Sequence, residues 1–326
     1  MLEPLVLRAQ RAFLTTLFCL GARKKRGRAT HKTGVGGQGI LQVHTDLDLP
    51  SHDLWEPGKS FQVQLRHANL NNEDDLSADY RGAALRLLDD SGRQHLDLLM
   101  NTGEATVWCH VAMFSERMWL TLRKRLPEFY TRYPKALERY WAGLRRAPEG
   151  YETLAYYSKL TSKYRARDGK LWGCRYRLLP EGWTGTDTGQ PNERDRRDGV
   201  LATARWPEES RPSDTLRRSY EARLRAAPLT YRLQIAVREA VTDHQHPMFD
   251  ACQPWDPKTY PWVDLASLTI DEPIPAAQLE ALAFNIANTP ESLGVFPAQS
   301  ARDYTSIGWL RASLYAAAAR QRPRDS

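Results

Sequence analysis

The sequence predicts an α+β protein whose centre is an antiparallel β-sheet or barrel. Four strand-like segments follow one another between residues 38 and 100, with turn signals and no helical segment between them. Helix-like segments then occupy much of residues 112–166 and, near the end of the chain, residues 305–320. Consecutive strands without intervening helices favour antiparallel pairing, and a separate set of helices makes the class α+β.

Each element is recognised by the spacing of its apolar residues. Strands alternate apolar and polar residues, as Phe61, Val63 and Leu65 do with their polar neighbours, and helices repeat apolar residues every three or four positions. The expected strands are 39–47, 61–66, 83–88, 96–100, 170–179, 229–241 and 265–270. The expected helices are 4–20, 113–126, 134–146, 213–226 and 305–320. The polar, Gly-containing stretch 181–199 is expected to be an exposed loop.

The composition is that of an ordinary folded protein. The chain has 326 residues, of which 41% are hydrophobic and 26% are charged, so a mostly disordered or collagen-like chain is excluded. Its 46 basic and 39 acidic residues give a formal net charge of +7. The basic residues are spread over the whole length without a basic stripe that alternates with aromatic residues, which argues against nucleic acid as a partner. The length fits either two domains or one large barrel domain.

The first 28 residues combine an apolar segment with a basic one. Residues 4–20 have helical apolar spacing, and five basic residues follow between Arg23 and Arg28. A secretory signal has the opposite order, with its positive charge first. The four cysteines include no CxxC pair, so we expect a cytoplasmic protein with free thiols and no thiolate zinc site. No run of about 18 apolar residues occurs, and no transmembrane helix is expected.

Two interpretations of this N-terminal region stay open. In the first, helix 4–20 packs on the body of the protein. In the second, residues 4–28 make a peripheral membrane contact, in which the apolar face enters the interface and the basic cluster faces anionic lipid.

Three short patterns have weak functional interpretations. The run 34–39 matches GxGxxG, but a strand follows it where a dinucleotide site needs a helix, so a flexible turn passing close to something flat is favoured. His244 and His246 form an HxH pair without a third zinc ligand, and a polar loop is expected. The acidic run from Glu73 to Asp79 lacks the spacing of an EF-hand loop and is expected to be solvated.

The last expected helix places Arg311 and Tyr315 at positions i and i+4, on one face. A guanidinium beside a phenol favours the phenolate, which is an anionic ligand for ferric iron. An ordinary surface pair is the alternative, because this spacing is common by chance. Other segments of the chain, taken together with this pair, favour the functional interpretation.

A series of segments, in a fixed order along the chain, resembles the catalase superfamily of haem proteins. The segment Arg28-Ala29-Thr30-His31, followed by glycines up to Gly39, is similar to the family's distal segment. The matching positions are Arg28, His31, Arg66, the Arg81-Gly82 pair, Asn101, Phe114, Arg311, Tyr315 and Arg322. Each match is weak alone, but their common order over residues 28–322 identifies the chain as a member of this family.

The resemblance implies a catalase-like antiparallel β-barrel with surrounding helices and a C-terminal helix that binds haem b. Tyr315 would be the axial ligand of the iron, and Arg311 would keep it ionised. His31 would act on a peroxide as general base and then general acid, with Asn101 as a hydrogen-bond donor. The haem contacts would be Arg28, Arg66 and Arg322 at the propionates and Phe114 over the distal face of the ring.

Two departures from the family pattern bear on the substrate. True catalases usually have Val before the distal histidine, whereas Thr30 stands here, which resembles the allene oxide synthase branch acting on fatty-acid hydroperoxides. The Thr30 hydroxyl can bond to His31 and compete for the nitrogen that relays the proton. We also expect most of the N-terminal arm and the C-terminal additions of large catalases to be absent, as in a mini-catalase.

We therefore expect a haem-dependent hydroperoxidase acting on organic or fatty-acid hydroperoxides, with a small true catalase as the alternative. A non-catalytic haem carrier or sensor and a barrel that binds ligands without haem are further alternatives. The expected organisation is an N-terminal helix with a basic segment, 1–27, and a haem-binding barrel domain, 28–326. A homo-oligomer is left open.

Overall fold

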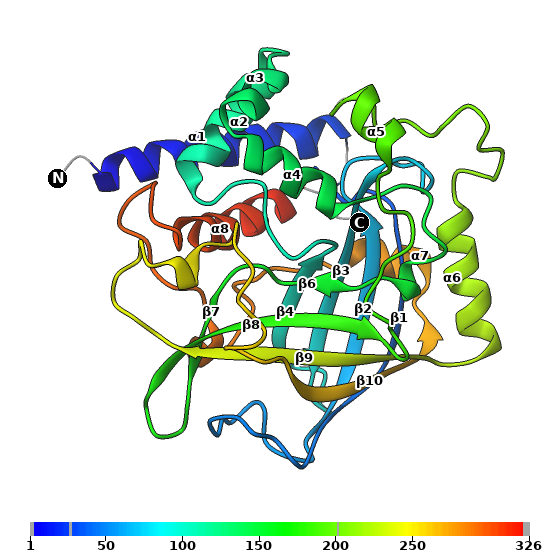
Figure 1. Cartoon of the computed structure of the whole chain (residues 1–326). Helices are drawn as coiled ribbons and strands as arrows, with labels where there is room; N and C mark the ends of the chain where they lie inside the picture. The colour runs from blue at the N-terminus through cyan, green and yellow to red at the C-terminus, as the bar shows by residue number, and fades with distance from the viewer. Residues whose placement is uncertain (1–2, 26–27, 201, 322–326) are drawn as a thin grey trace.

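A closed antiparallel β-barrel lies at the centre of the computed structural model, which describes residues 3–25, 28–200 and 202–321 (Figure 1). In the described chain, eight strands pair in the order β2-β1-β10-β9-β8-β6-β4-β3, and β3 pairs with β2 to close the ring. The strands are β1 (Gly34–Val43), β2 (Ser60–Asn69), β3 (Asp79–Leu88), β4 (Gln94–Asn101), β6 (Tyr156–Tyr157), β8 (Leu171–Pro180), β9 (Leu229–Glu239) and β10 (Val263–Pro273). The predicted antiparallel barrel is confirmed.

The interior of the barrel is filled by every second residue of its strands, as the side-chain period of two requires. Phe61, Val63 and Leu65 of β2 are buried there, together with Leu85 of β3 and Leu98 of β4. The intervening residues face outward, where helices or solvent cover them. The alternation read from the sequence therefore sets which side chains reach the outer wall.

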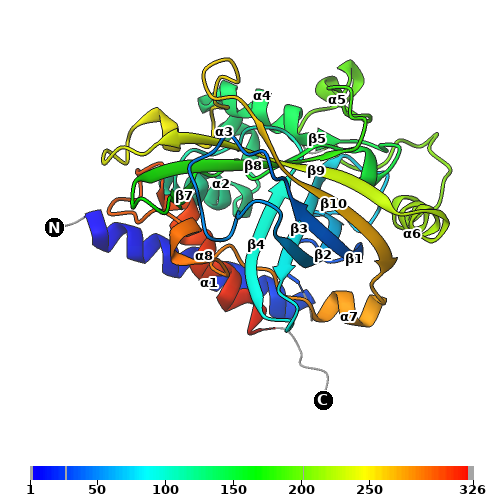
Figure 2. The ribbon, with the colours of Figure 1, turned by 90° about the horizontal axis from the view of Figure 1, so that it is seen from below.

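Most helices lie on one side of the barrel, and α6 (Thr215–Ala226) and α7 (Ala276–Ala281) pack against β1 and β10 on another (Figures 1 and 2). α1 (Glu3–Lys25) and α8 (Ser306–Ala319) pack against each other beside β3 and β4 (Figures 1 and 2). The remaining helices are α2 (Val111–Leu122), α3 (Leu126–Arg132), α4 (Pro134–Gly143) and α5 (Glu193–Asp198). The 3-10 turns are Tyr151–Thr153, Pro247–Phe249 and Glu291–Leu293. The strands β5 (Leu144–Arg145) and β7 (Ser162–Arg165) pair with β3 and β8 outside the ring.

Three segments differ from their predicted structure. The stretch 181–199, expected to be an exposed loop, contains α5, and its Asp187 and Asp195 side chains are buried. Residues 144–166, expected to continue the helical region, form β5, a 3-10 turn, β6 and β7, because buried aromatic residues such as Tyr151, Tyr156 and Tyr164 fill the barrel core. The glycine run 34–39, expected to be a turn, is the first half of β1. A Cβ on Gly34 would lie 2.6 Å from the Arg66 guanidinium carbon, so the glycine lets that side chain cross the strand.

Helix α1 has a buried face and an exposed apolar face. Leu7, Leu14 and Ala22 are buried, in part against α8 and α2, whereas Leu5 is 59% and Leu20 is 56% exposed. By length and composition alone, α1 is apolar enough to cross a membrane. No transmembrane helix is expected from the sequence, because charged residues interrupt the apolar residues of this segment. The helix as a whole is nevertheless long and apolar enough, even with these charged residues.

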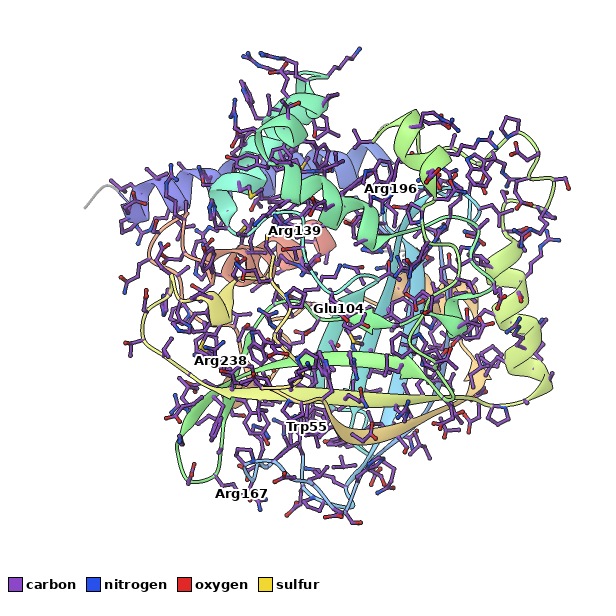
Figure 3. The ribbon with its side chains drawn as sticks, viewed as in Figure 1. Trp55, Glu104, Arg139, Arg167, Arg196 and Arg238 are labelled. Carbon is purple, nitrogen blue, oxygen red and sulfur yellow. The ribbon has the colours of Figure 1, made fainter. Side chains whose placement is uncertain are left out.

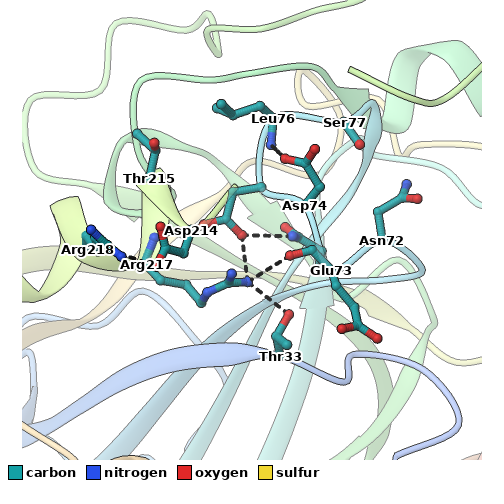
Figure 4. A network of polar contacts seen from close by, with 12 residues as sticks. Thr33, Asn72, Glu73, Asp74, Leu76, Ser77, Asp214, Thr215, Arg217 and Arg218 are labelled. Carbon is teal, nitrogen blue, oxygen red and sulfur yellow. Dashed lines mark hydrogen bonds and ion pairs between the residues drawn. The ribbon is translucent and has the colours of Figure 1, made fainter. Parts of the chain in front are cut away.

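The loop between β2 and β3 is tied to α6 by a buried ion pair (Figure 4). Arg217 donates to Asp75 Oδ1 at 2.8 Å and to Thr33 Oγ1 at 2.9 Å, and Asp75 is fully buried. The expectation that the acidic run is solvated is therefore wrong for Asp75 and for the buried Asp79. The network fixes Thr33, two residues after His31, against this loop.

Candidate functional site

The outer wall of β2, β3 and β4 forms one side of the site. The strand register aligns Ala68, Gly82 and Asn101 in one row across the three strands. The next row consists of Arg66, Ala84 and Leu99. These positions alternate with the barrel core, so they share the outward face. Because the residues at the centre of these two rows have small side chains, the wall is recessed there, and polar groups lie at its edges.

Gly82 lies directly beneath two of the predicted distal residues. A Cβ at this position would lie 2.9 Å from His31 Cε1, 3.1 Å from His31 Nδ1 and 3.2 Å from Asn101 Oδ1. The imidazole and the amide therefore converge over the glycine. The absence of a side chain at Gly82 allows this close approach.

The backbone of His31 is held in an unusual conformation. Its φ angle is 55°, in the left-handed region that non-glycine residues adopt uncommonly. Its N–H donates to the Leu70 carbonyl at 2.9 Å, and its carbonyl accepts from Arg66 Nη2 at 3.0 Å. Such conformations persist where surrounding contacts enforce them, and they cluster at functional sites.

The environment keeps His31 neutral. Burial, followed by the positive charges of Arg66, Arg28 and Arg311, lowers the pKa of His31 to about 3. At neutral pH the imidazole therefore has an unprotonated nitrogen that can accept a proton. The low pKa also means that a proton taken up there is readily passed on.

Helix α8 faces this wall with the predicted Arg–Tyr pair. The phenolic oxygen of Tyr315 accepts hydrogen bonds from Arg311 Nη2 at 2.8 Å and from Nε at 3.1 Å. Leu314 and Ala318 lie on the same face of the helix. A phenolic oxygen with two guanidinium donors is suited to carry negative charge.

His31, Asn101 and Tyr315 line one cavity between the barrel wall and the helices. Its empty volume is about 780 Å³, including its opening to solvent. The other predicted residues that line it are Arg28, Thr30, Arg66 and Arg311. Residues from both ends of the chain thus meet in one place, as the resemblance requires.

Two of the predicted arginines share a carboxylate at the edge of the cavity. Glu280 of α7 accepts from Arg28 Nε at 3.3 Å and from Arg66 Nη2 at 3.1 Å. Both guanidinium groups are buried, whereas the Glu280 side chain is 49% exposed. Among the residues that the structure describes, none is a hydrogen-bond partner of the buried Arg66 Nε. The two arginines can therefore bind carboxylate groups at this edge, and Arg66 Nε is a donor that a further carboxylate could use.

These features fit a haem group. A wall of small residues suits a flat ring, and Arg28 and Arg66 suit its carboxylates. The phenolic oxygen of Tyr315, with its two guanidinium donors, suits ferric iron, since tyrosinate is one of the ligands that hold haem iron in proteins. The donor set, the glycine cradle and the unpaired Arg66 Nε agree with one another.

Two predicted haem contacts are placed differently or lie outside the structure. Phe114 of α2 is not among the residues that line the cavity; its ring packs 4.6 Å from that of Trp108 and 6.3 Å from that of Phe18. Phe18 of α1 lines the cavity instead. Arg322 lies outside the described residues, and its role stays a prediction.

Several lining residues were not anticipated from the sequence. They are Phe18, Ala68, Ala84, Leu99, Met100, Phe284, Leu314 and Ala318, with Glu280 at the edge. Leu314 and Ala318 follow from the helical spacing of Arg311 and Tyr315, and Ala68 and Ala84 follow from the strand register. No signal in the sequence marks Glu280. The HxH pair is elsewhere: His246 caps a 3-10 turn through Nδ1, and His244 faces Asp303.

Sequence comparison finds relatives that are longer than this chain, and no family model matches it. The chain is 38% identical over 315 residues to an allene oxide synthase-lipoxygenase protein of Plexaura homomalla, covering 95% of this chain and 30% of the relative. It is 28% identical over 305 residues to a linolenate 9R-lipoxygenase of Nostoc sp., covering 90% of this chain and 38% of the relative. The chain thus spans about a third of the length of these proteins.

Structure comparison identifies the architecture. Catalase A from Saccharomyces cerevisiae superposes with a TM-score of 0.68 at 18% identity, covering 91% of this chain and 61% of that one. A fungal catalase superposes with a TM-score of 0.67 at 19% identity, covering 91% of this chain and 59% of that one. The barrel and its helices have the fold of these proteins.

Proposed function

Because the chain belongs to the catalase superfamily and has an allene oxide synthase-lipoxygenase relative, we propose that it is a haem-dependent hydroperoxidase for organic or fatty-acid hydroperoxides. The observation that carries the proposal is the meeting of His31 and Asn101 with Arg311 and Tyr315 in one cavity. A haem b with Tyr315 as the iron ligand would supply the redox chemistry that cleaves the peroxide bond.

On the distal side, His31 moves the proton. Its neutral imidazole takes the proton from the bound hydroperoxide, and the low pKa of the group favours its return to the departing oxygen. Asn101, whose amide lies beside the imidazole over Gly82, donates a hydrogen bond that orients the peroxide. The left-handed backbone of His31 aims the ring at this position.

Arg28 and Arg66 anchor the ring carboxylates in this proposal. Glu280 occupies both guanidinium groups, and a propionate would share or replace that partner. Arg66 also holds the His31 carbonyl, so the anchoring residue and the proton-transfer residue are mechanically joined. The two hydrogen bonds from Arg311 would stabilise negative charge on the Tyr315 oxygen when it binds iron.

An apolar hydroperoxide is favoured over hydrogen peroxide as substrate by the cavity lining. Phe18, Leu99 and Phe284 present apolar surface in the same cavity as the polar distal pair. Thr30 lines the same cavity and sits next to His31, where its hydroxyl can engage the imidazole and slow proton relay to a small peroxide. A lipid hydroperoxide gains binding energy from the apolar walls that hydrogen peroxide cannot use.

The same purified sample distinguishes the two substrates. Consumption of a fatty-acid hydroperoxide, followed by the products formed, is compared with oxygen release from hydrogen peroxide. The proposal expects rapid lipid turnover with weak oxygen release, and Thr30→Val should raise oxygen release. Brisk oxygen release without lipid turnover would instead identify a small true catalase, and an unchanged Thr30→Val rate would remove the argument from the threonine.

A cytoplasmic location with peripheral membrane contact through α1 completes the proposal. The exposed apolar residues Leu5, Val6, Phe13 and Leu20 would enter the lipid interface. Sedimentation with anionic vesicles tests this contact, and Phe13→Ser with Leu20→Ser should abolish it. A protein that remains in the supernatant with all vesicles contradicts it.

A further inference from the structure

Two cysteines form a pair outside the haem cavity. Cys109 lies two residues before the start of α2, and Cys252 follows the 3-10 turn Pro247–Phe249. They are 143 positions apart in the sequence. Their sulfur atoms and an oxygen of Asp250 all lie within 4.8 Å of one another.

The backbone around the pair holds the two segments together. The Thr106 N–H donates to the Ala251 carbonyl at 2.8 Å, and the Thr106 hydroxyl lies 3.7 Å from Cys252 Sγ. Asp250 Oδ1 accepts from the Cys252 N–H at 2.8 Å. The thiols are therefore brought together by ordered main-chain contacts rather than by the chance approach of two surface loops.

The two thiols differ in exposure and in role. Cys252 is 5% exposed, and its hydrogen bond with Cys109, followed by burial, raises the pKa of Cys252 well above its usual value. Cys109 is half-buried and lies just before the start of α2, whereas Cys252 is almost fully enclosed, so a hydroperoxide reaches the Cys109 sulfur first. These differences make Cys109 the nucleophile and Cys252 its partner.

We propose that Cys109 and Cys252 form a redox dithiol that a hydroperoxide oxidises to a disulfide. The Cys109 thiol gives up its proton, and its sulfur attacks the outer oxygen of the hydroperoxide. The O–O bond breaks, the leaving alkoxide takes up that proton and departs as an alcohol, and Cys109 becomes a sulfenic acid. The Cys252 sulfur then attacks that sulfenic sulfur, and water leaves with the Cys252 proton. In sum, two thiols and one hydroperoxide give one disulfide, one alcohol and one water.

Oxidation explains the surroundings of the pair better than a bound metal does. Both Asp250 oxygens already accept hydrogen bonds, from the Cys252 N–H and from Gln253 Nε2. The positive charge of Arg139 acts on Cys252, and Figure 3 places Arg139 beneath α4, toward the barrel. The buried Arg175 is close to both Asp250 and Cys252. Guanidinium groups support thiolate chemistry and oppose a metal cation.

The disulfide would act on the haem cavity through α2. Trp108, next to Cys109, stacks on Phe114, and Phe114 packs against Phe18 of the cavity wall. A covalent link to Cys252 would fix the start of α2 and the aromatic residues that follow it. The pair thus gives a hydroperoxide-handling protein a device that responds to excess hydroperoxide.

The test uses the purified haem-loaded protein exposed to a small excess of cumene hydroperoxide or hydrogen peroxide. Peptide mapping under non-reducing conditions should recover a Cys109–Cys252 cross-link, and diamide, which oxidises dithiols without haem, should give the same product. The buried Cys174, whose pKa burial raises to about 12, serves as an internal control and should stay reduced. Cys252→Ser should stop the reaction at a sulfenic acid on Cys109 that dimedone traps, whereas Cys109→Ser should leave Cys252 unmodified.

Three results would overturn the proposal. The first is a wild-type pair that stays reduced with all three oxidants while Cys19 is modified. The second is a disulfide between chains in place of the internal one. The third is a metal ion that copurifies with the wild type at one per chain and is lost from both serine variants. Failure of lipid turnover would not affect these readouts, because thiol oxidation is measured directly and diamide requires no haem.

Discussion

Arg311 donates two hydrogen bonds to the phenolic oxygen of Tyr315, at 2.8 Å from Nη2 and 3.1 Å from Nε. The two residues lie one turn apart on α8, so the helix itself sets their distance. The same arginine lines the cavity that contains His31 on the opposite wall. A phenol that accepts two guanidinium hydrogen bonds and a neutral imidazole therefore face one space, which is the arrangement that the proposed haem site needs.

Removal of the Arg311 guanidinium should weaken haem binding. Arg311→Leu leaves Tyr315 without its two donors, and loss of such a supporting partner typically costs about 10–100-fold in metal affinity. Titration of the apoprotein with haem, followed by its visible absorption, measures the effect. Arg320→Leu, an exposed position at the end of the same helix, should bind haem as the wild type does. Equal affinities for both variants would contradict the role of Arg311.

Gly82→Ala should impair catalysis without unfolding the barrel. The new methyl group would lie 2.9 Å from His31 Cε1 and 3.2 Å from Asn101 Oδ1, so both side chains must move. Misplacement of catalytic groups lowers the rate steeply, by about 100-fold for a displacement of about 1 Å, so turnover should fall. Gly308→Ala on α8, whose Cβ would meet only Val295 at 3.7 Å, is the matched control. Wild-type turnover by Gly82→Ala would show that the approach of His31 and Asn101 is unimportant.

Substitution of Arg66 at the cavity edge should weaken haem binding, whereas substitution of Glu280 should not. Arg66→Leu removes a proposed propionate partner and the donor to the His31 carbonyl, so haem affinity should fall by about 10-fold or more. Glu280→Gln removes the carboxylate that now occupies Arg28 and Arg66, so affinity should stay the same or rise. Haem titration of both variants measures this. A loss with Glu280→Gln as large as with Arg66→Leu would show that Glu280 is part of the haem site.

Stability should fall as the pH falls below about 6.5. Burial lowers the pKa of His31 and His67 to about 3 and that of His52 to about 4. The unfolded chain binds protons at these residues near pH 6.5, so below that pH it holds more protons than the folded state. The contribution of these three histidines to the free energy of unfolding is fully present above pH 6.5. It should decrease toward pH 4 by up to ~1.4 kcal/mol per pH unit for each histidine.

Urea unfolding at pH 7, 6 and 5 measures this dependence. His67→Asn should lower stability at pH 7 and also flatten the pH dependence by one histidine, because the buried ring no longer titrates. His44→Asn, at a partly exposed position, should leave the slope unchanged. A wild-type slope that His67→Asn does not alter would show that this residue does not titrate on unfolding.

The strands of the barrel and the residues of the site were predictable to different degrees. The alternation along β2 predicts a strand with Phe61, Val63 and Leu65 on one face, and this face packs into the barrel core. The same period of two places Arg66 on the outer wall. The ordered match to a known family led to His31, Asn101 and Tyr315, which line one cavity. The strand prediction is confirmed because it depends on local periodicity. The residues found from their order along the chain lie together, and their chemical roles stay predictions.

The failures share a physical origin in contacts that are distant in sequence. Residues 144–166 have apolar residues that a helix or a buried strand would both use, and only the closure of the barrel makes Tyr156–Tyr157 a strand. Phe18 reaches the cavity because α1 packs on α8 from the far end of the chain. Glu280 pairs with Arg28 across some 250 positions, which no local pattern records.

The proposed ligation of haem iron by Tyr315 is tested most directly by the visible absorption spectrum of haem-reconstituted wild type and Tyr315→Phe. The account predicts a Soret band and ferric tyrosinate features for the wild type at one haem per chain. It predicts that the phenylalanine variant, with its fold intact by circular dichroism, loses these features and its hydroperoxide turnover. A folded wild type that binds no haem, or a Tyr315→Phe spectrum identical to the wild type, would contradict the account.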